Sequence, residues 1–143
     1  MADAQQRAGS DIGAKDDIEM RLGANLVHLP IVRAVAVNIA MRADFDVDAI
    51  SDLELAVDEA CSSLIAHAVA GSVLACRFTI GADDIMFTVT VTSAEDVTPS
   101  ESTFGWRVLT TLTDGVTSWA DQLEDSLHEV HIEFVKRRPV VSR

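Results

Sequence analysis

The sequence lacks long apolar runs and export signals. No uninterrupted hydrophobic stretch approaches the roughly 20 residues that a membrane-spanning helix requires. The first residues contain no basic start followed by an apolar segment, as a secretory signal would. No internal repeat or low-complexity segment is present either. We therefore expect a soluble, cytoplasmic chain rather than a membrane or secreted protein.

Cysteine is scarce, and metal-binding patterns are missing. Cys61 and Cys76 are the only two cysteines, and they are not closely spaced. Because both fall in apolar patterns, we expect two free, mostly buried thiols in a reducing compartment. The four histidines are scattered, and His128 and His131 point to opposite faces of an expected strand. The sequence thus gives no support for a zinc site.

Positive charge is also in short supply. Eleven basic residues stand against 23 acidic ones, which gives a formal net charge of -12. Such a chain repels the phosphate backbone, so direct binding to nucleic acid is disfavoured. We expect a basic protein partner instead, for example a protein whose DNA-facing surface this chain covers.

The apolar residues that are present define one domain. Of the 143 residues, 48% are hydrophobic, enough for a folded core. We expect a flexible tail at 1–17, a domain at 18–138 and a frayed end at 139–143. The periodicity predicts an α/β (α+β) two-layer sandwich, with a mixed, mostly antiparallel sheet and helices on one face. The predicted strands are 18–26, 74–80, 85–91, 116–120 and 127–135, and the predicted helices are 30–43, 46–71 and 104–113.

The long helix predicted at 46–71 has two chemically different faces. Apolar residues recur at spacings of three and four from Ile50 to Ala68, which makes one stripe core. Glu59 and Ser63 share the opposite face with Ala56 and Ala66, where a ligand or another chain could approach closely. The alternative is that the acidic residues of this helix are ordinary solvated charges, favoured toward its N-terminal half.

The first helix is apolar on two faces. One stripe runs from Val32 to Ala43, and a second includes Val37 and Met41, with Arg33 nearby. A helix with two apolar faces usually has two neighbours. The second neighbour is either another part of the same domain or a dimer or partner interface.

The segment ELAVDEACSSLIAHA, residues 54–68, resembles the first nucleotide-binding box of the anti-sigma-factor serine kinases of the RsbW and SpoIIAB type. These kinases belong to the gyrase, Hsp90, histidine-kinase and MutL ATPase superfamily, and the resemblance extends over about residues 18–138. It implies a histidine-kinase-like ATPase fold with ATP and magnesium as cofactors. Glu59 matches the glutamate that acts as general base or orients water. Ser63 stands where an asparagine ligates magnesium, and its shorter hydroxyl is a candidate metal ligand.

The other two boxes depart from the family pattern. In the second box, Ser93 falls near the position of the aspartate that holds adenine in the family. The glycines that adjoin this aspartate are absent. Asp96 is the substitute for the aspartate if the register shifts. Gly105 keeps one glycine of the third box, while Thr103 replaces the other and the bulky Trp106 follows. With these contacts altered, we expect a binding protein first and doubt kinase activity.

The resemblance implies an anti-sigma factor that sequesters an alternative, stress-type sigma factor and is released by an anti-anti-sigma protein. It also implies a homodimer in which the first helix contributes to the partner surface, with Arg33, Val37 and Met41 as candidate contacts. The alternative is an active ATP-dependent serine kinase, with Glu59 as base, that phosphorylates the anti-anti-sigma factor. A catalytically silent adaptor for another regulator shares the same fold, and Arg33 is otherwise a plain surface arginine.

Overall fold

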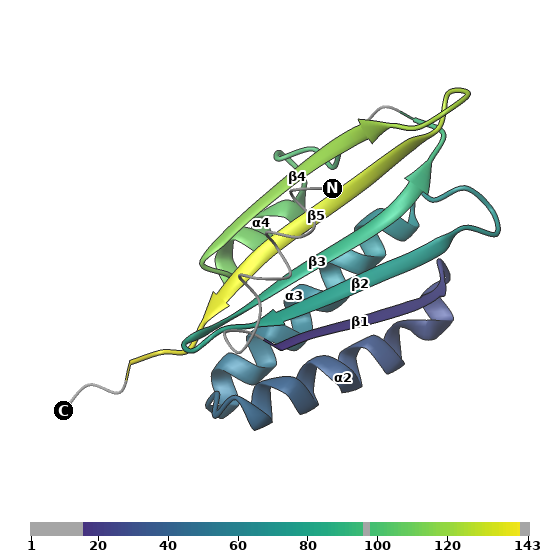
Figure 1. Ribbon diagram of the computed structural model, residues 1–143. Helices are drawn as coiled ribbons and strands as arrows, with labels where there is room; N and C mark the ends of the chain where they lie inside the picture. The colour runs from purple at the N-terminus through teal and green to yellow at the C-terminus, as the bar shows by residue number, and fades with distance from the viewer. Residues whose placement is uncertain (1–15, 96–97, 141–143) are drawn as a thin grey trace, which may run out of the picture.

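The computed structural model describes residues 16–95 and 98–140. Figure 1 shows how the strands and helices are arranged. In chain order the elements are β1 (Asp16–Gly23), the short 3-10 helix η1 (Leu26–His28), α2 (Leu29–Arg42), α3 (Val47–Ile65), β2 (Val73–Ile80), β3 (Asp84–Ser93), α4 (Phe104–Leu112), β4 (Gly115–Gln122) and β5 (His128–Arg137).

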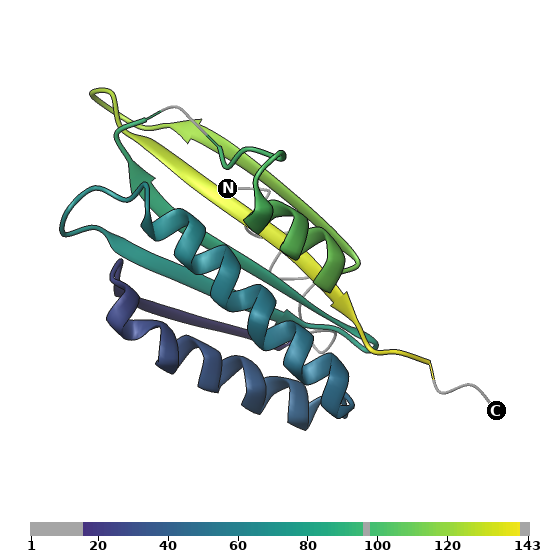
Figure 2. The same ribbon diagram turned by 180° about the vertical axis from the view of Figure 1, so that it is seen from behind.

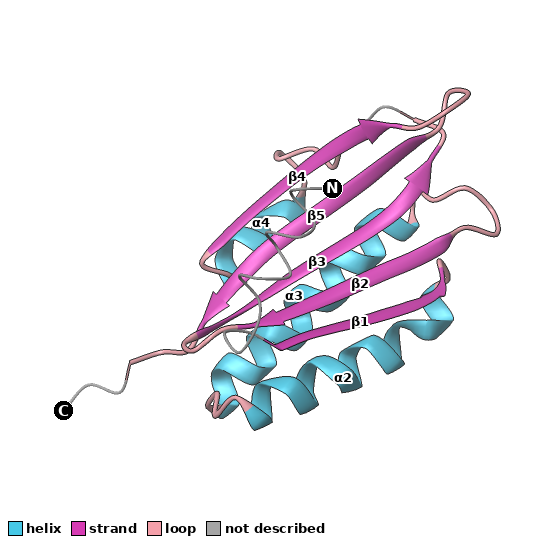
Figure 3. Cartoon of the chain, viewed as in Figure 1, coloured by secondary structure: helices cyan, strands magenta, loops and turns pink. Residues whose placement is uncertain are grey.

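The strands form one sheet with the order β1-β2-β3-β5-β4. The helices cover one face and leave the other face open, as seen from behind in Figure 2 and by element type in Figure 3. This arrangement confirms the predicted two-layer α+β fold. Each pair of neighbouring strands is antiparallel. No parallel pair forms among the described strands because β5 lies between β3 and β4, the two strands that α4 connects.

The core lies between the sheet and the helices. Strict alternation along the strands places every second side chain on the helix-covered face, as the sequence predicted. Three phenylalanines from adjacent strands pack at its centre, with ring centroids 4.8 Å apart for Phe78–Phe87 and 5.4 Å for Phe87–Phe134. Cys61 and Cys76 are free and buried in the same core, which confirms the expectation for both thiols.

The long helix α3 is shorter than predicted. It begins where expected, because the Asp46 side chain accepts a hydrogen bond from the Ala49 N–H at 2.8 Å and caps the first turn. It ends at Ile65 rather than near Gly71. Beyond that point Ala68 pairs with Ser93 of β3, and the Val69 N–H donates to the Thr92 carbonyl at 2.9 Å. Pairing with the sheet therefore overrides the helical periodicity of this segment.

The N-terminal boundaries also differ from the prediction. β1 begins at Asp16 and so includes two residues assigned to the flexible tail. It ends at Gly23 rather than residue 26, because Asn25 caps η1 by accepting a hydrogen bond from the Val27 N–H at 3.0 Å. The α2 helix then starts at Leu29 with Pro30 in its first turn, the position that proline favours.

Candidate nucleotide and partner sites

Glu59 and Ser63 lie one turn apart on α3 and contact each other. The Ser63 hydroxyl donates a hydrogen bond to Glu59 Oε2 at 3.0 Å. Both side chains are half-buried. This hydrogen bond joins the two residues into one unit, while the hydroxyl oxygen keeps its lone pairs.

The carboxylate of Glu59 also lies against the beginning of α4. A Cβ atom added to Gly105 would collide with Glu59 Oε2 and lie 3.0 Å from Cδ, so only glycine leaves room for this contact. The first turn of α4 contains no acidic residue of its own. Because exposed N–H groups give a helix N-terminus partial positive charge, the Glu59 carboxylate is well placed to compensate it. We call Glu59, Ser63 and Gly105 the Glu59 cluster.

The small-residue face of α3 is covered within the chain at Ala56 but not at Ala66, which is exposed. Ala56, predicted to border an open approach beside Glu59, is fully buried. The α4 helix packs on this side of α3. Trp106 anchors α4 in the core, and Thr103 caps the helix by accepting a hydrogen bond from the Trp106 N–H at 3.1 Å. Trp106, the bulky residue of the third box, therefore holds α4 in place.

Lys136 holds the other end of α4. Its ammonium donates to the Leu112 carbonyl at 2.8 Å and to Asp52 Oδ2 at 3.2 Å. One side chain from β5 therefore ties the C-terminus of α4 to α3, and only 13% of that side chain is exposed. The position of α4 against Glu59 is consequently supported at both ends of the helix.

The second nucleotide box has no free anchor at Ser93. This residue is fully buried at the end of β3, and its hydroxyl accepts a hydrogen bond from the Glu95 N–H at 3.0 Å. The hydroxyl therefore stabilises the following turn. Asp96, the alternative candidate for the adenine-binding aspartate, lies outside the described residues.

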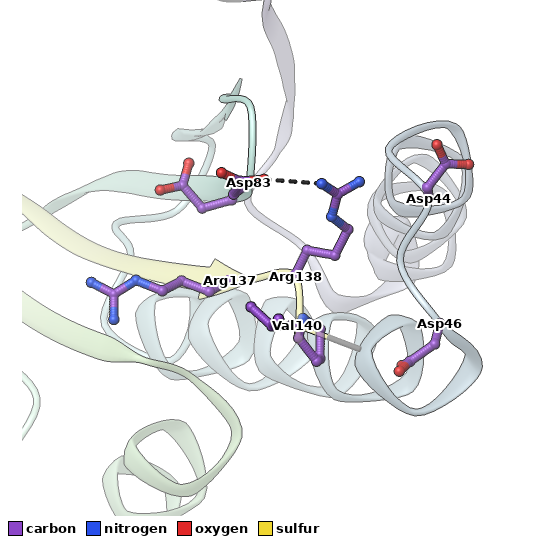
Figure 4. A pocket seen from close by; sticks show the side chains of 8 residues that line it. Asp44, Asp46, Asp83, Arg137, Arg138 and Val140 are labelled. Atoms are coloured by element: carbon purple, nitrogen blue, oxygen red, sulfur yellow. Dashed lines mark hydrogen bonds and ion pairs between the residues drawn. The ribbon is translucent and has the colours of Figure 1, made fainter. Parts of the chain in front are cut away.

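Within residues 16–95 and 98–140, none of the cavities found is lined by Glu59, Ser63 or Gly105, although an apolar one of about 300 Å³ lies beside them between Leu55 and Phe104. The largest, about 700 Å³, is at the opposite end of α3 and is open and highly charged. Figure 4 shows Asp44, Asp46, Asp83, Arg137, Arg138 and Val140 around it. Arg138 Nη2 already pairs with Asp83 Oδ1 at 2.9 Å, and Asp46 caps α3. This cavity contains none of the predicted site residues.

The described residues do not fit magnesium ATP in this arrangement. Ser93 is fully buried and uses its hydroxyl group within the chain, and the Glu59 carboxylate lies against the α4 N-terminus, whose N–H groups would otherwise suit a phosphate. A bound nucleotide would have to displace the Glu59 carboxylate, because the carboxylate and the phosphates are both negatively charged and repel each other. The predicted box residues Glu59, Ser63 and Gly105 are nevertheless brought together, as the sequence resemblance expects.

The candidate partner residues lie in one row along α2. Arg33, Val37 and Met41 follow each other at a spacing of four, and 61% of Met41 is exposed. We call these three residues the α2 row. Arg33 Nη1 donates a hydrogen bond to Asp58 Oδ1 of α3 at 2.6 Å, with about a third of each side chain exposed. The sequence reading missed Asp58, because no spacing rule links residues on different helices.

The opposite flank of α2 carries an open apolar groove of about 530 Å³ beside β1. Its lining is mostly hydrophobic, and Ile31 is one of its exposed members. The groove is lined by Ile18, Pro30, Ile31, Ala34, Val35, Asn38, Ile39 and Arg42. Val37 and Met41, which define the second apolar stripe expected for this helix, lie in the α2 row and not in this groove, whose members Val35 and Ile39 belong to the first stripe.

The two core cysteines lie next to each other across the α3–β2 interface. A hydrogen bond with Cys76, together with burial, raises the pKa of the Cys61 thiol well above its ordinary range. The thiolate is the reactive form of cysteine, so Cys61 remains protonated and inert in the folded chain. This result agrees with a packing role for both residues.

Comparison with known proteins gives the family of this chain. Residues 22–122 match the model of the histidine kinase-like ATPase domain. The match covers more than half of the 143 residues, and the chain belongs to this family.

The more specific similarities are to RsbW proteins. The anti-sigma-F factor RsbW of Mycobacterium tuberculosis is 31% identical over 104 residues, which cover 73% of this chain and 62% of that protein. The serine-protein kinase RsbW of Bacillus cereus is 34% identical over 53 residues, covering 37% of this chain and 33% of that protein. The chain thus spans less than two thirds of the length of these relatives.

A solved structure confirms the fold. The crystal structure of the RsbU and RsbW domains of a Mycobacterium tuberculosis protein matches 85% of this chain and 32% of the other, with a TM-score of 0.61. At 13% sequence identity, this similarity supports the architecture alone.

Proposed function

We propose that the chain is an anti-sigma factor that binds and sequesters an alternative, stress-type sigma factor and is released by an anti-anti-sigma protein. The observation that carries this proposal is the α2 row, a line of one arginine and two apolar residues in which Met41 is exposed, Arg33 and Val37 are half-buried, and Arg33 is held by its pair with Asp58. The similarity to a protein named anti-sigma-F factor supports it.

Charge supports a protein partner with a basic surface. The net charge of -12 disfavours contact with nucleic acid and favours rapid association with a positively charged surface. The DNA-facing surface of a sigma factor has this chemistry. Apolar contacts from Val37 and Met41 would then supply affinity at the centre of the interface.

Phosphoryl transfer is the alternative function, and the Glu59 cluster argues against it. Transfer requires nucleotide, metal and acceptor to be positioned together. Here the Ser93 hydroxyl is buried and bonded within the chain, and Ser63 is shorter than the asparagine it replaces, so we propose that ATP and magnesium bind weakly or not at all. Glu59 is the candidate base for a kinase reaction.

We further propose a cytoplasmic homodimer that uses the groove on the β1 side of α2. That flank is apolar and separate from the α2 row, so a second copy and a sigma factor can bind at the same time. Consistent with a location away from the membrane, no described helix combines the length and hydrophobicity needed to cross a bilayer.

A binding experiment with a matched pair of variants tests the main proposal. Individually purified sigma factors are titrated onto the immobilised chain, with core RNA polymerase as competitor. Arg33→Glu breaks the pair with Asp58 and places two carboxylates side by side, so the α2 row should lose its arrangement and sigma binding should weaken by at least about tenfold, or ~1.4 kcal/mol. Arg42→Glu makes the same change on the other flank of this helix and should leave sigma affinity nearly unchanged.

Two results would contradict this proposal. One is that no sigma factor binds the unchanged chain, and the other is that both charge reversals weaken binding equally. Circular dichroism of each variant establishes that it is folded. Incubation with labelled ATP, magnesium and a candidate anti-anti-sigma protein separates the kinase alternative, which requires transfer of label that is lost in Glu59→Gln.

A further inference from the structure

The open face of the sheet carries a cluster of metal-binding side chains at the end of the β4–β5 hairpin. Asp121 and Glu129 are directly opposite each other in the register of these strands, and His131 is opposite Trp119. All three cluster members face away from the helices, because the intervening residues Val130 and Ile132 are buried in the core.

The donor atoms of the three side chains converge on one point. His131 Nε2 lies 3.1 Å from Asp121 Oδ2 and 3.7 Å from Glu129 Oε1, and all three atoms are within 4.8 Å of one another. Two ligand atoms bound at about 2.1 Å to the same ion are roughly 3.0–3.5 Å apart. A small adjustment of the exposed carboxylates therefore suffices to surround an ion.

The imidazole of His131 is fixed in the orientation that such a site requires. Its ring stacks on Trp119, with centroids 4.6 Å apart and planes 16° from parallel, and only 11% of the side chain is exposed. Nδ1 is 2.8 Å from the Thr90 hydroxyl, its cross-strand neighbour on β3. Metal-binding histidines characteristically donate the N–H of the second ring nitrogen to such an acceptor, which leaves the other nitrogen free for the ion.

The negative charge of the carboxylates beside His131 favours the binding of a cation. Two carboxylates face the imidazole nitrogen in a chain with a net charge of -12. A divalent ion compensates both carboxylates. One imidazole with two carboxylates suits zinc and neighbouring transition metals better than magnesium or calcium, which prefer oxygen ligands alone.

We propose that Asp121, Glu129 and His131 bind one divalent transition-metal ion of the zinc class, with Thr90 as the positioning residue. This site is independent of the proposed sigma-factor binding and lies away from the Glu59 cluster. Three protein ligands leave at least one coordination position for water. Sequence spacing does not reveal the site, because Asp121 comes from a different strand.

Calorimetric titration of the full-length, EDTA-treated and dialysed chain with zinc chloride tests this inference. We expect one equivalent to bind and to raise the thermal unfolding midpoint, whereas magnesium chloride should do neither. His131→Ala should abolish both effects. Thr90→Val, which removes only the hydroxyl beside Nδ1, should weaken zinc binding by roughly tenfold or more.

Two further variants make the result decisive. Asp121→Asn preserves the shape of an exposed side chain and should also weaken zinc binding, so it decides the question if His131→Ala does not fold. His67→Ala is the matched control, because among the described residues His67 pairs with one carboxylate, Glu95, at 3.6 Å, and its removal should leave zinc binding unchanged. Absence of zinc binding in the unchanged chain, or equal binding after both His131→Ala and Asp121→Asn, would overturn the proposal and leave an ordinary histidine–carboxylate ion pair.

Discussion

The Glu59 cluster and the α2 row lie on neighbouring helices but use their chemical groups differently. In the Glu59 cluster, the carboxylate receives the Ser63 hydroxyl and abuts Gly105 at the α4 N-terminus. In the α2 row, Arg33 makes one ion pair with Asp58, while most of Met41 remains exposed. The first region is satisfied by contacts within the chain, and the second retains surface for another molecule.

This difference bears on the two functions that the resemblance implies, which are nucleotide chemistry and protein binding. Nucleotide chemistry requires polar groups that are free before the ligand arrives, whereas protein binding requires an exposed surface of the right shape. Here the polar groups are engaged and the surface is present. The geometry therefore favours a regulator that works by binding over one that works by phosphoryl transfer.

The strongest way to disturb the Glu59 cluster is to release α4. Lys136→Met keeps most of the side-chain stem but removes the bonds to the Leu112 carbonyl and to Asp52. Because Lys136 is largely buried, we expect the free energy of unfolding to fall by about 1.5–3 kcal/mol. Urea denaturation measures the change.

An exposed ion pair serves as the control for this substitution. Arg138→Met removes the pair with Asp83, whose side chain is 79% exposed, and should cost about 0–1 kcal/mol. If both variants lose the same stability, Lys136 does not fix α4. Sigma-factor affinity of the folded protein should be unchanged in either variant, because the α2 row is untouched.

The next prediction concerns the α2 row and its neighbouring groove. Met41→Lys should change the free energy of unfolding by less than about 0.5 kcal/mol, because the side chain is exposed. It should weaken sigma binding by roughly tenfold, since it places charge in the proposed interface. Titration calorimetry measures the affinity.

The matched control is Ile31→Lys, which makes a comparable change in the groove on the opposite flank of α2. It should leave sigma affinity intact and shift the chain from dimer to monomer in light scattering. If Ile31→Lys abolished sigma binding and Met41→Lys left it unchanged, the roles would be reversed. The sigma factor would then bind at the groove and the second copy of the chain at the α2 row.

The sequence predicted the fold well because periodicity is a local property. Alternation along the strands and the apolar stripe of α3 both appear in the structure, and the helix starts where the pattern placed it, with Asp46 as its cap. The end of α3 was placed too late because Ala68 pairs with Ser93, a residue that is distant in sequence. Local patterns do not contain such pairings.

The site was predicted less completely, since it depends on contacts between elements. The resemblance selected Glu59, Ser63 and Gly105, but nothing in their spacing shows that the carboxylate rests against the α4 N-terminus. The ion pair of Arg33 with Asp58 was missed for the same reason. Residue types identify candidate groups, and tertiary packing decides which of them remain free.

The smallest expected effect tests the role of Glu59 itself. Glu59→Gln keeps an oxygen for the Ser63 hydroxyl and removes only the charge beside the α4 N-terminus. If the carboxylate compensates the helix dipole, stability should fall by about 0.3–1 kcal/mol, and the loss should shrink in high salt. Glu54→Gln on the same helix is the control and should have less effect. A gain in stability in Glu59→Gln would instead indicate that the charged carboxylate destabilises the fold, as catalytic groups often do. That result would favour the kinase alternative.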